Sequence, residues 1–419
     1  MKNIQSAEIL CTGTELLLGD IVNTNGAFMA QRLAELGIPT YRQDVIGDNP
    51  GRLRELIGEA FGRVDTLILC GGLGPTCDDL TKETVAEYFG VPMYLDAPSL
   101  EKIKRFFRIT GRAMPENNIK QAMIPEGSVI FTNDNGTAPG MAVECGDKTA
   151  ILLPGPPNEL IPMWRDRVDP YLRGRSSGAI VSHNLFIMKM GESAVGTVLE
   201  DMIKNRANPS VATYAGNSEV RLRISARAAT EAEAEALCQA TIAEVQATEV
   251  GPCIFGIDVG SSENALLLQL RKRGMTLALA ESCTGGLMAK RITDIPGCSD
   301  VFLGSCVTYA NSAKEAVLGV KHDTLETYGA VSEQTAREMA EGVRAKLGAS
   351  MGLSVTGVAG PDGGTAEKPV GTVFIAVATE KGTEVRRLSL SSTRSRDFIR
   401  GASASKLFGL ALDILAEQA

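Results

Sequence analysis

The sequence predicts an α/β protein of three modules, with boundaries at residues 1–172, 173–256 and 257–419. A chain of 419 residues is long enough for several domains, each with its own core. In the outer two modules, short apolar runs alternate with segments of helical periodicity. Several of these runs end in Gly-rich loops, an order typical of parallel sheets covered by helices. Between them we expect a small α+β module that follows a Gly- and Ser-containing linker at 174–178.

Composition excludes several classes of function. The formal net charge is −8, which disfavours a general nucleic-acid binder. The chain has two histidines, so a His-based triad or a multi-His metal centre is not expected, and any hydrolase must use carboxylate–metal chemistry or a Ser with a Lys or Tyr partner. Nine cysteines without a C-x-x-C pair indicate free thiols in a reducing compartment. With no signal sequence or membrane-length apolar run, we expect a cytoplasmic protein.

The first module begins with a strand at 7–12 and a helix at 25–36 that stops at Gly37. A compact strand at 66–70 runs into Gly71-Gly72-Leu73-Gly74-Pro75-Thr76, and a helix then extends to about residue 89. The Gly loop is suited to cradling phosphates, and Asp78 and Asp79 offer hard oxygen ligands for a divalent cation. An Asp in the first turn of a helix is equally well explained as a cap.

Further loops are expected at the same edge of this sheet. Residues 133–140 form a turn-rich loop before a strand at 141–144, and a strand at 151–153 ends in the loop 154–159. Polar residues at 13–25 follow the first strand. Because the sites of α/β enzymes lie in loops at the carboxyl ends of strands, we expect these segments to converge.

The middle module is predicted to contain strands at 184–189 and 219–228 and helices at 192–204 and 230–248. This order is similar to that of a KH-type unit. Residues 173–255 contain eight Lys and Arg against nine Asp and Glu, and they contain no GxxG loop of the kind that clamps RNA. We therefore interpret the module as a spacer or dimerisation unit rather than a nucleic-acid binder.

The third module opens with a helix at 263–273, followed by a strand at 277–280 and the turn Glu281-Ser282-Cys283-Thr284-Gly285-Gly286. A helix is predicted from residue 287. This arrangement would expose the Ser282 hydroxyl beside unpaired amides of a helix N-terminus, which suit a phosphate or an oxyanion. An ordinary Gly-rich turn that contains Ser and Cys is the alternative.

Further polar groups follow the later strands of this module. After a strand at 302–307, the spacing of Tyr309 and Lys314 would allow a phenol and an amine to share one site, although a packed Tyr and a solvated Lys explain it as well. A helix over 329–345 is capped by Ser332. Strands follow at 353–355, 372–378 and 388–390, with the densest Gly loop at 356–364. Arg394 or Arg396, at the start of the last helix, is placed to bind a phosphate, surface exposure being the alternative.

Taken together, the motifs resemble the CinA family of competence/damage-inducible proteins. The C-terminal motifs are ESCTGG (281–286), Y-x-x-x-x-K (309–314), TGVAGPDGG (356–364) and SRDFIR (395–400). The N-terminal ones, GGLGPT-x-DD-x-T (71–81), NGTAPGM (135–141) and PGPPNE (154–159), resemble the family's molybdopterin-binding-like domain, and the middle module stands where the family has its KH-type domain. The resemblance covers essentially the whole chain.

The resemblance implies a C-terminal deamidase that converts nicotinamide mononucleotide and water to nicotinate mononucleotide and ammonia without a cofactor. By motif position, Ser282 would be the nucleophile, with Lys314 and Tyr309 as its proton-handling partners. Thr356 would position the amide or stabilise the oxyanion, and Arg396 would bind the substrate or its phosphate. Chemistry alone leaves Cys283 as a rival nucleophile. The remaining substrate-binding residues at this site would be Cys283, Thr284, Gly285, Gly286, Gly357 and Gly360.

For the N-terminal domain, the resemblance implies a metal-dependent ADP-ribose pyrophosphatase. Asp78 and Asp79, with Glu15 joining them, would hold a divalent cation that polarises the pyrophosphate and activates water. The substrate-binding residues would be Gly71, Gly72, Gly74, Thr76, Asn135, Gly136 and Glu159. Both activities would serve pyridine-nucleotide salvage, and a homodimer is the family expectation.

Two alternatives stay open. A non-enzymatic nucleotide-binding regulator or DNA-uptake accessory would bind DNA in a salt-dependent way without turnover. A molybdopterin-handling enzyme would retain a bound pterin.

Overall fold

The computed structural model describes residues 4–175, 178–216 and 219–417. The chain separates into two compact units, residues 1–181 with 227–235 and residues 182–226 with 236–419. Most residues of the middle and C-terminal modules thus belong to the second of these units. Part of the predicted linker, residues 176–177, lies outside the described residues.

The N-terminal module is built on a six-stranded sheet of order β2-β1-β3-β8-β7-β6. The first four strands of this order are mutually parallel, and β7 and β6 complete the sheet in antiparallel fashion. The predicted strands at 7–12, 66–70, 141–144 and 151–153 are confirmed, while β2 and β6 were not anticipated. The strands are β1 (Ala7–Thr12), β2 (Thr40–Ile46), β3 (Thr66–Cys70), β6 (Val129–Phe131), β7 (Gly140–Cys145) and β8 (Lys148–Leu153).

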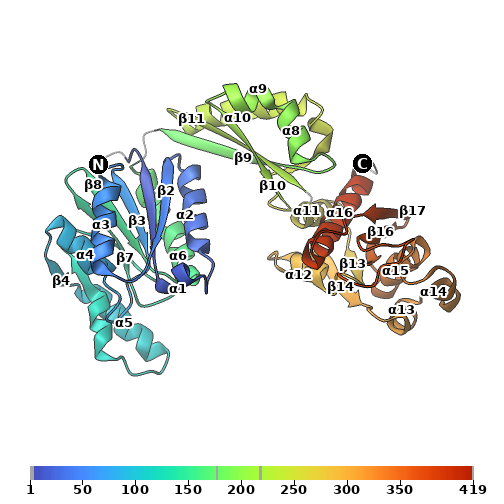
Figure 1. Cartoon of the computed structure of the whole chain (residues 1–419), viewed down its shortest axis with the longest axis horizontal. Coiled ribbons are helices and arrows are strands. Elements are labelled where there is room, and N and C mark those ends of the chain that lie inside the picture. The colour runs from blue at the N-terminus through green and yellow to red at the C-terminus, as the bar shows by residue number, and fades with distance from the viewer. Residues whose placement is uncertain (1–3, 176–177, 217–218, 418–419) are drawn as a thin grey trace. The chain divides into compact units, whose positions relative to one another are not determined.

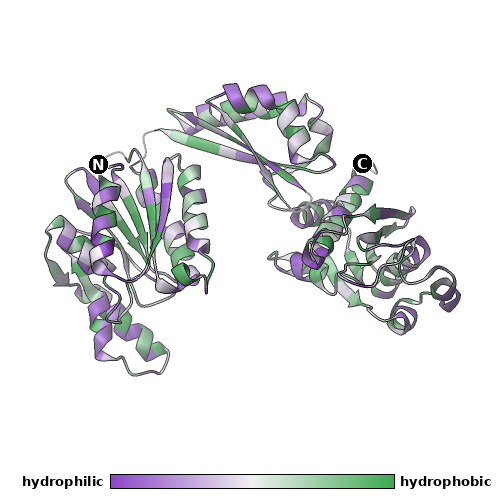
Figure 2. Cartoon of the chain, viewed as in Figure 1, coloured by the Kyte–Doolittle hydropathy of each residue, from purple (hydrophilic) through white to green (hydrophobic). Residues whose placement is uncertain are grey.

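Helices cover both faces of this sheet because successive strand residues point to opposite sides. Ile9 of β1 packs with Met29 and Trp164 on one face, whereas its neighbour Leu10 packs with Ile57 on the other. The inner strands β1, β3 and β8 are hydrophobic along most of their length, as Figure 2 shows, whereas the edge strand β2 is largely polar. The predicted α/β sandwich is therefore observed. Its helices are α1 (Thr14–Leu18), α2 (Thr24–Glu35), α3 (Pro50–Phe61), α4 (Thr81–Phe89), α5 (Ala97–Ile109), α6 (Pro157–Met163) and α7 (Asp169–Arg173), and β4 (Met93–Leu95) pairs with β5 (Met123–Pro125) as a separate ribbon (Figure 1).

The middle module has a four-stranded sheet of order β10-β11-β9-β12. One predicted helix, at 192–204, is interrupted at Leu199, which ends one short helix and precedes the next. Two of the strands, β10 and β12, were not anticipated. The elements are β9 (Ala179–Ile187), α8 (Glu192–Val198), α9 (Glu200–Asn205), β10 (Ser210–Ala215), β11 (Val220–Ala228), α10 (Glu231–Gln246) and β12 (Ile254–Ile257).

The C-terminal module has a five-stranded sheet of order β14-β13-β15-β16-β17, in which β14, β13 and β15 are parallel and the last two strands antiparallel. The strands are β13 (Leu277–Glu281), β14 (Phe302–Val307), β15 (Met351–Gly357), β16 (Thr372–Thr379) and β17 (Gly382–Ser389). Its helices are α11 (Ser262–Lys272), α12 (Leu287–Thr293), α13 (Asn311–Leu318), α14 (His322–Tyr328), α15 (Glu333–Leu347) and α16 (Arg396–Glu417).

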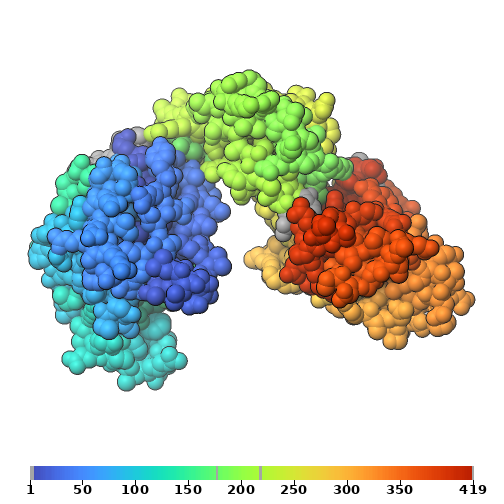
Figure 3. All heavy atoms as spheres, in the orientation of Figure 1, coloured from blue at the N-terminus to red at the C-terminus, as the bar shows by residue number. Residues whose placement is uncertain are grey.

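The strand β13 contributes side chains to the hydrophobic cores on both faces of this sheet. Leu279 packs with residues of α11 and α16, whereas Ala278 and Ala280 pack with residues of α14 and α15. On α15 the predicted Ser332 cap is confirmed, since its side chain accepts from Thr335 N. Most of α16 is buried, and its exposed residues lie at its two ends and at Lys406; atoms of this C-terminal segment are visible on the face shown in Figure 3.

Candidate functional site

Ser282 lies directly after the buried strand β13, as predicted. Its amide donates to Val355 O at 3.0 Å, which ties the turn to β15. Gly285 and Gly286 then adopt φ values of 57° and 93°, in the left-handed region that glycine occupies without strain, and α12 begins at Leu287. Ser282 is only 9% exposed. The hydrogen bond from its amide to β15 holds it at the carboxyl edge of the sheet.

The expectation that the amides of the α12 N-terminus are free for a ligand is wrong. The side chain of Glu281 is fully buried and occupies that position itself. Its carboxylate accepts hydrogen bonds from Gly286 N (2.9 Å), Met288 N (3.1 Å) and Ala289 N (2.9 Å). It also accepts from the hydroxyls of two neighbours, Thr284 at 2.8 Å and Ser305 at 3.1 Å. A carboxylate at the positive end of a helix needs no cation to be stable there.

Two amides of the turn remain available. Within the described part of the chain, the N–H groups of Cys283 and Thr284 donate to no other residue. The carbonyl of Thr284 accepts from the Arg400 guanidinium, which fixes the orientation of this peptide segment. Adjacent amides next to a candidate nucleophile are the arrangement that stabilises an oxyanion. The turn, rather than the helix, therefore supplies the free donors.

The side chain of Lys314, on α13, contacts the side chain of Ser282. Its side chain is fully buried, and Nζ lies 3.1 Å from Ser282 Oγ, 2.8 Å from Thr308 O and 3.1 Å from Tyr309 O. No ion pair of Lys314 is found among the described residues. Burial without a carboxylate lowers the pKa of the Lys314 amine because the charged form loses its hydration. The surface-lysine alternative is therefore excluded by the fold.

Tyr309 and Arg396 meet at the open side of this site. The Tyr309 side chain is exposed, and its hydroxyl accepts from Arg396 Nη2 at 3.2 Å. Arg396 also donates to Gly360 O at 2.6 Å, which links the start of α16 to the Gly-rich loop after β15. The remaining N–H groups of this exposed guanidinium face no carboxylate in the described chain. Tyr309 contacts Lys314 through its backbone carbonyl only.

Thr356 is fully buried at the end of β15, and its hydroxyl donates to Ala330 O at 2.7 Å. Because the single hydroxyl proton is used, Thr356 can accept a hydrogen bond from an amide N–H but cannot donate one to an oxyanion. Of its two predicted roles, only that of positioning the amide is compatible with this contact. Gly357 beside it has no room for a side chain, since a Cβ would lie 2.6 Å from Val373 Cγ2.

Cys283 is 5% exposed, and burial raises the pKa of its thiol to about 12. A thiol that stays protonated is a poor nucleophile, since the thiolate is the reactive form. The geometry thus favours Ser282, whose hydroxyl is the one in contact with an amine.

The loops predicted to converge in the N-terminal module do so. Gly71 N donates to Leu153 O at 3.0 Å, and Asn25 Nδ2 donates to Gly155 O at 2.6 Å, so loops after three different segments share one edge. Gly71 and Gly72 have φ values of 105° and 68°. A Cβ on Gly71 would lie 2.4 Å from Thr12 O, which explains glycine at this close approach of two loops.

Asp79 organises the Gly loop instead of capping α4. Its carboxylate accepts from the amide of Thr76 at 2.9 Å and from the Thr76 hydroxyl, and a Cβ on Gly74 would lie 2.4 Å from it. The cap position of α4 is Leu80, which makes no side-chain cap bond. Asp78 is exposed, and a hydrogen bond from Thr76 lowers the pKa of its carboxyl.

The second loop is held by Glu159. Its carboxylate accepts from Asn133 Nδ2 at 2.6 Å, and desolvation raises the pKa of the Glu159 carboxyl. It covers Gly136, where a Cβ would lie 2.0 Å away, while Asn135 N donates to Asn133 Oδ1 at 3.0 Å. Asn135, Gly136 and Glu159 therefore form one folded loop at the same edge.

The structure does not bring Glu15 to the two aspartates. Glu15 lies in the first turn of α1, and no group of three or more His, Cys, Asp or Glu that could hold a metal ion occurs in the described chain. Asp78 and Asp79 still offer two oxygen-donor side chains at the loop. Mg²⁺ is commonly held by one or two carboxylates together with substrate phosphates, so this pair fits such an ion, and the metal remains a prediction.

Sequence reasoning missed the groups that support both sites. Glu281 and Arg400 hold the Ser282 turn, and Lys120 Nζ donates to Thr76 O at 3.0 Å beneath the Gly loop. Lys82 is buried, donates to Lys120 O at 2.6 Å, and has its pKa lowered to about 8 by burial. For Lys82 the sequence does contain a signal. This lysine interrupts the apolar stripe of α4, where burying an unpaired charge is costly.

Comparisons with known proteins agree with this architecture. Residues 8–174 match the model of a probable molybdopterin binding domain, residues 182–256 that of the damage-inducible protein CinA KH domain, and residues 260–417 that of the CinA C-terminal domain. No helix in the described ranges is long and apolar enough to cross a membrane.

Relatives extend along nearly the full length of the chain. A CinA-like protein of Dictyoglomus thermophilum is 49% identical over 389 residues, covering 93% of this chain and 94% of its own. A CinA-like protein of Dictyoglomus turgidum is 47% identical with the same coverage. The crystal structure of competence/damage inducible protein CihA from Agrobacterium tumefaciens, with a TM-score of 0.36, is 39% identical and covers 37% of this chain and 93% of its own. The chain belongs to the CinA family.

Proposed function

We propose that the C-terminal module is an amidase that deamidates nicotinamide mononucleotide. The observation that carries the proposal is the contact of 3.1 Å between Ser282 Oγ and the buried Lys314 Nζ. Deamidation needs a nucleophile, a group that accepts and returns a proton, and donors for the oxyanion. Ser282 and the amides of Cys283 and Thr284 in the turn, together with Lys314 of α13, supply these groups.

The three contacts of Lys314 suit a neutral amine. Two of its N–H bonds point at the carbonyls of Thr308 and Tyr309, which leaves the nitrogen lone pair for the Ser282 hydroxyl. The lowered pKa of Lys314 makes this neutral form accessible. Lys314 then accepts the Ser282 proton as Oγ attacks the carboxamide carbon, and the oxyanion takes hydrogen bonds from the two free amides.

Collapse of the tetrahedral adduct breaks the C–N bond, and Lys314 passes its proton to the leaving group, which departs as ammonia. Water attacks the resulting ester, giving up a proton to Lys314, and the carboxylate product leaves as Ser282 regains its hydrogen. One water is consumed and one ammonia released. Thr356, with only acceptor capacity left, would hold the amide N–H₂ before attack.

Substrate recognition is assigned to the open side of the site. Arg396 is exposed at the start of α16 and has guanidinium N–H groups beyond those that contact Gly360 and Tyr309. A guanidinium binds phosphate oxygens in a bidentate manner. The phosphate of the mononucleotide would lie at Arg396, with Tyr309 against its sugar or ring.

Ammonia release from nicotinamide mononucleotide by the full chain tests the proposal. We expect turnover in the wild type and a loss of at least ~10³-fold in Ser282→Ala. Cys283→Ala is the matched control, since it removes the neighbouring nucleophile from the same turn. Near-normal deamidation by Ser282→Ala, or salt-dependent DNA binding without any turnover, would overturn the proposal in favour of a different catalyst or a DNA-uptake accessory.

We further propose that the N-terminal module hydrolyses the pyrophosphate of ADP-ribose. The supporting observation is the Gly loop at the carboxyl edge of a parallel sheet, with Asp78 exposed and Asp79 shaping the loop. A divalent cation on these carboxylates would neutralise pyrophosphate charge and activate water. Lys120, which holds the loop through Thr76 O, would keep the phosphate cradle open.

The assay is AMP release from ADP-ribose with a panel of divalent metals. Asp78→Asn should abolish it while leaving deamidation unchanged, because the two sites share no residue. Asp147→Asn is the control, since Asp147 is exposed in the turn between β7 and β8, at the start of β8 rather than at its carboxyl end. Unchanged hydrolysis in the Asp78→Asn and Asp79→Asn variants would refute the assignment, and a pterin retained by the purified chain would favour a molybdopterin-handling enzyme instead.

A further inference from the structure

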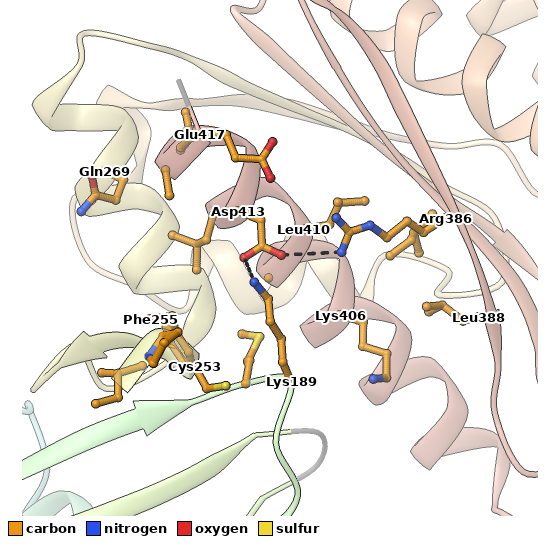
Figure 4. A pocket seen from close by; sticks show the side chains of 18 of the residues that line it. Lys189, Cys253, Phe255, Gln269, Arg386, Leu388, Lys406, Leu410, Asp413 and Glu417 are labelled. Atoms are coloured by element: carbon orange, nitrogen blue, oxygen red, sulfur yellow. Dashed lines mark ion pairs between the residues drawn. The ribbon is translucent and has the colours of Figure 1, made fainter. Parts of the chain in front are cut away.

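A cavity of about 460 Å³ lies in the unit that contains the C-terminal module, away from the Ser282 site. Its walls come from the end of β9, the segment before and within β12, and the helices α11 and α16, with β16 and β17 closing one side (Figure 4). It shares no lining residue with the Ser282 site. Its volume is in the range of small-molecule sites, about 300–1,000 Å³.

One wall of the cavity is apolar. It is formed by side chains that include Met188, Phe255, Leu388 and Leu410. Met188 reaches its place because α16 carries a glycine there: a Cβ on Gly409 would lie 2.5 Å from Met188 Sδ. Such a surface suits a planar or apolar group of a ligand rather than water alone.

The other groups of the cavity are mainly cationic. Lys189, Arg273, Arg386 and Lys406 line it, against the carboxylates of Asp413 and Glu417. Asp413 already pairs with Lys189 at 2.7 Å and with Arg386 at 3.6 Å, and Arg386 also pairs with Glu384 at 2.8 Å. Figure 4 shows both cations reaching Asp413, with Lys406 beside them and Phe255 across the cavity. In the described chain, Arg273 and Lys406 have no carboxylate partner. The cavity is thus positive in a chain of net charge −8.

The backbone at Lys189 is a second, independent observation. Lys189 has a φ of 71°, in the left-handed region that residues other than glycine seldom occupy. Strained backbone of this kind persists where the surrounding structure holds a side chain in a required place, and it is concentrated at binding sites. The Lys189 ammonium lies 2.7 Å from Asp413 at the cavity.

We propose that this cavity is a binding site for a nucleoside monophosphate, separate from the two catalytic sites. A phosphate monoester carries a charge of about −1.5 to −2 at pH 7, which the two lining cations without a carboxylate partner in the described chain, Arg273 and Lys406, can offset. Arg273 offers a planar guanidinium group for the phosphate, and Lys406 offers a point charge. The apolar wall takes the base, and the carboxylate of Glu417 can accept from sugar hydroxyls.

Calorimetric titration of the full chain tests the proposal. The protein carries Ser282→Ala and Asp78→Asn to prevent turnover, and the probes are AMP, UMP and nicotinate mononucleotide, with adenosine and inorganic phosphate for comparison. We expect at least one nucleotide to bind more tightly than adenosine or phosphate. Lys406→Glu, and independently Arg273→Glu, should weaken that binding by roughly tenfold or more, because each reverses a charge that faces the phosphate.

Lys381→Glu is the matched control, since Lys381 is an exposed lysine in the turn between β16 and β17. It should bind the nucleotide like the parent. Hydrogen exchange should show nucleotide-dependent protection in β17 and the second half of α16. The proposal is overturned if no nucleotide binds, if inorganic phosphate binds equally well, or if Lys406→Glu and Arg273→Glu, folded as judged by circular dichroism, bind like Lys381→Glu.

Discussion

Replacing Lys314 by Met tests the central contact of the proposed amidase. Met has a similar length and fills the buried space, but it cannot take the proton from Ser282. The loss of a general base that also activates the nucleophile reduces kcat by about 10²–10⁴-fold, and we expect about 10³-fold here. The change also leaves Thr308 O and Tyr309 O without their donor, at a cost of about 1–3 kcal/mol each, offset by removal of a buried amine.

The assay is ammonia release from nicotinamide mononucleotide, with circular dichroism to establish that the variant is folded. Lys314→Arg distinguishes a proton acceptor from a positive charge, because the guanidinium stays protonated and cannot act as a base. Lys381→Met is the control at an exposed lysine. A Lys314→Met or Lys314→Arg protein with kcat within about tenfold of the wild type would refute the role of Lys314.

The pH dependence follows from the same contact. Because burial lowers the pKa of Lys314, the neutral amine becomes populated at a lower pH than for a solvated lysine. We expect kcat/KM to rise with pH and to reach a plateau above that lowered pKa. A profile that falls as pH rises, with the protein still folded, would contradict a neutral Lys314 as the base.

Three further predictions concern the groups around the two sites. Glu281→Gln turns one acceptor oxygen into a donor facing a backbone N–H, so it should destabilise the C-terminal module by about 2–4 kcal/mol; an unchanged calorimetric unfolding temperature would contradict the anchoring role. Cys283→Ala should keep deamidation within about threefold of the wild type, since a thiol whose pKa is raised to about 12 is not the nucleophile; a loss as large as that of Ser282→Ala would restore it as a candidate. Folding lowers the pKa of Lys82 to about 8 from 10.5, so the unfolded chain binds more protons in this interval and stability should rise with pH across it, by about 3 kcal/mol in total. Lys82→Met should abolish that rise, which denaturant unfolding at pH 7.5 to 10 would measure.

Patterns among neighbouring residues predicted the strands and the helix cap that depend on interactions between neighbouring residues. The apolar runs of β1 and β3 were placed at their observed ends, because a buried strand between turn residues is visible as a short apolar block. The cap of α15 was found because a Ser hydroxyl satisfies an amide within its own first turn. β10 was missed, since this half-buried strand carries no such block.

In the candidate site, too, some features were predicted from neighbouring residues and others depend on the tertiary structure. The order of residues alone placed Ser282 in a turn between a buried strand and a helix, because glycines and the change of periodicity mark that turn. Only the tertiary structure decided which groups are free to act on a substrate. Glu281 turns back to take the helix amides, the fold buries Lys314 against Ser282, and Thr356 uses its proton on Ala330. These outcomes depend on contacts between segments distant in the chain, where burial removes water and leaves each polar group only its neighbours as partners.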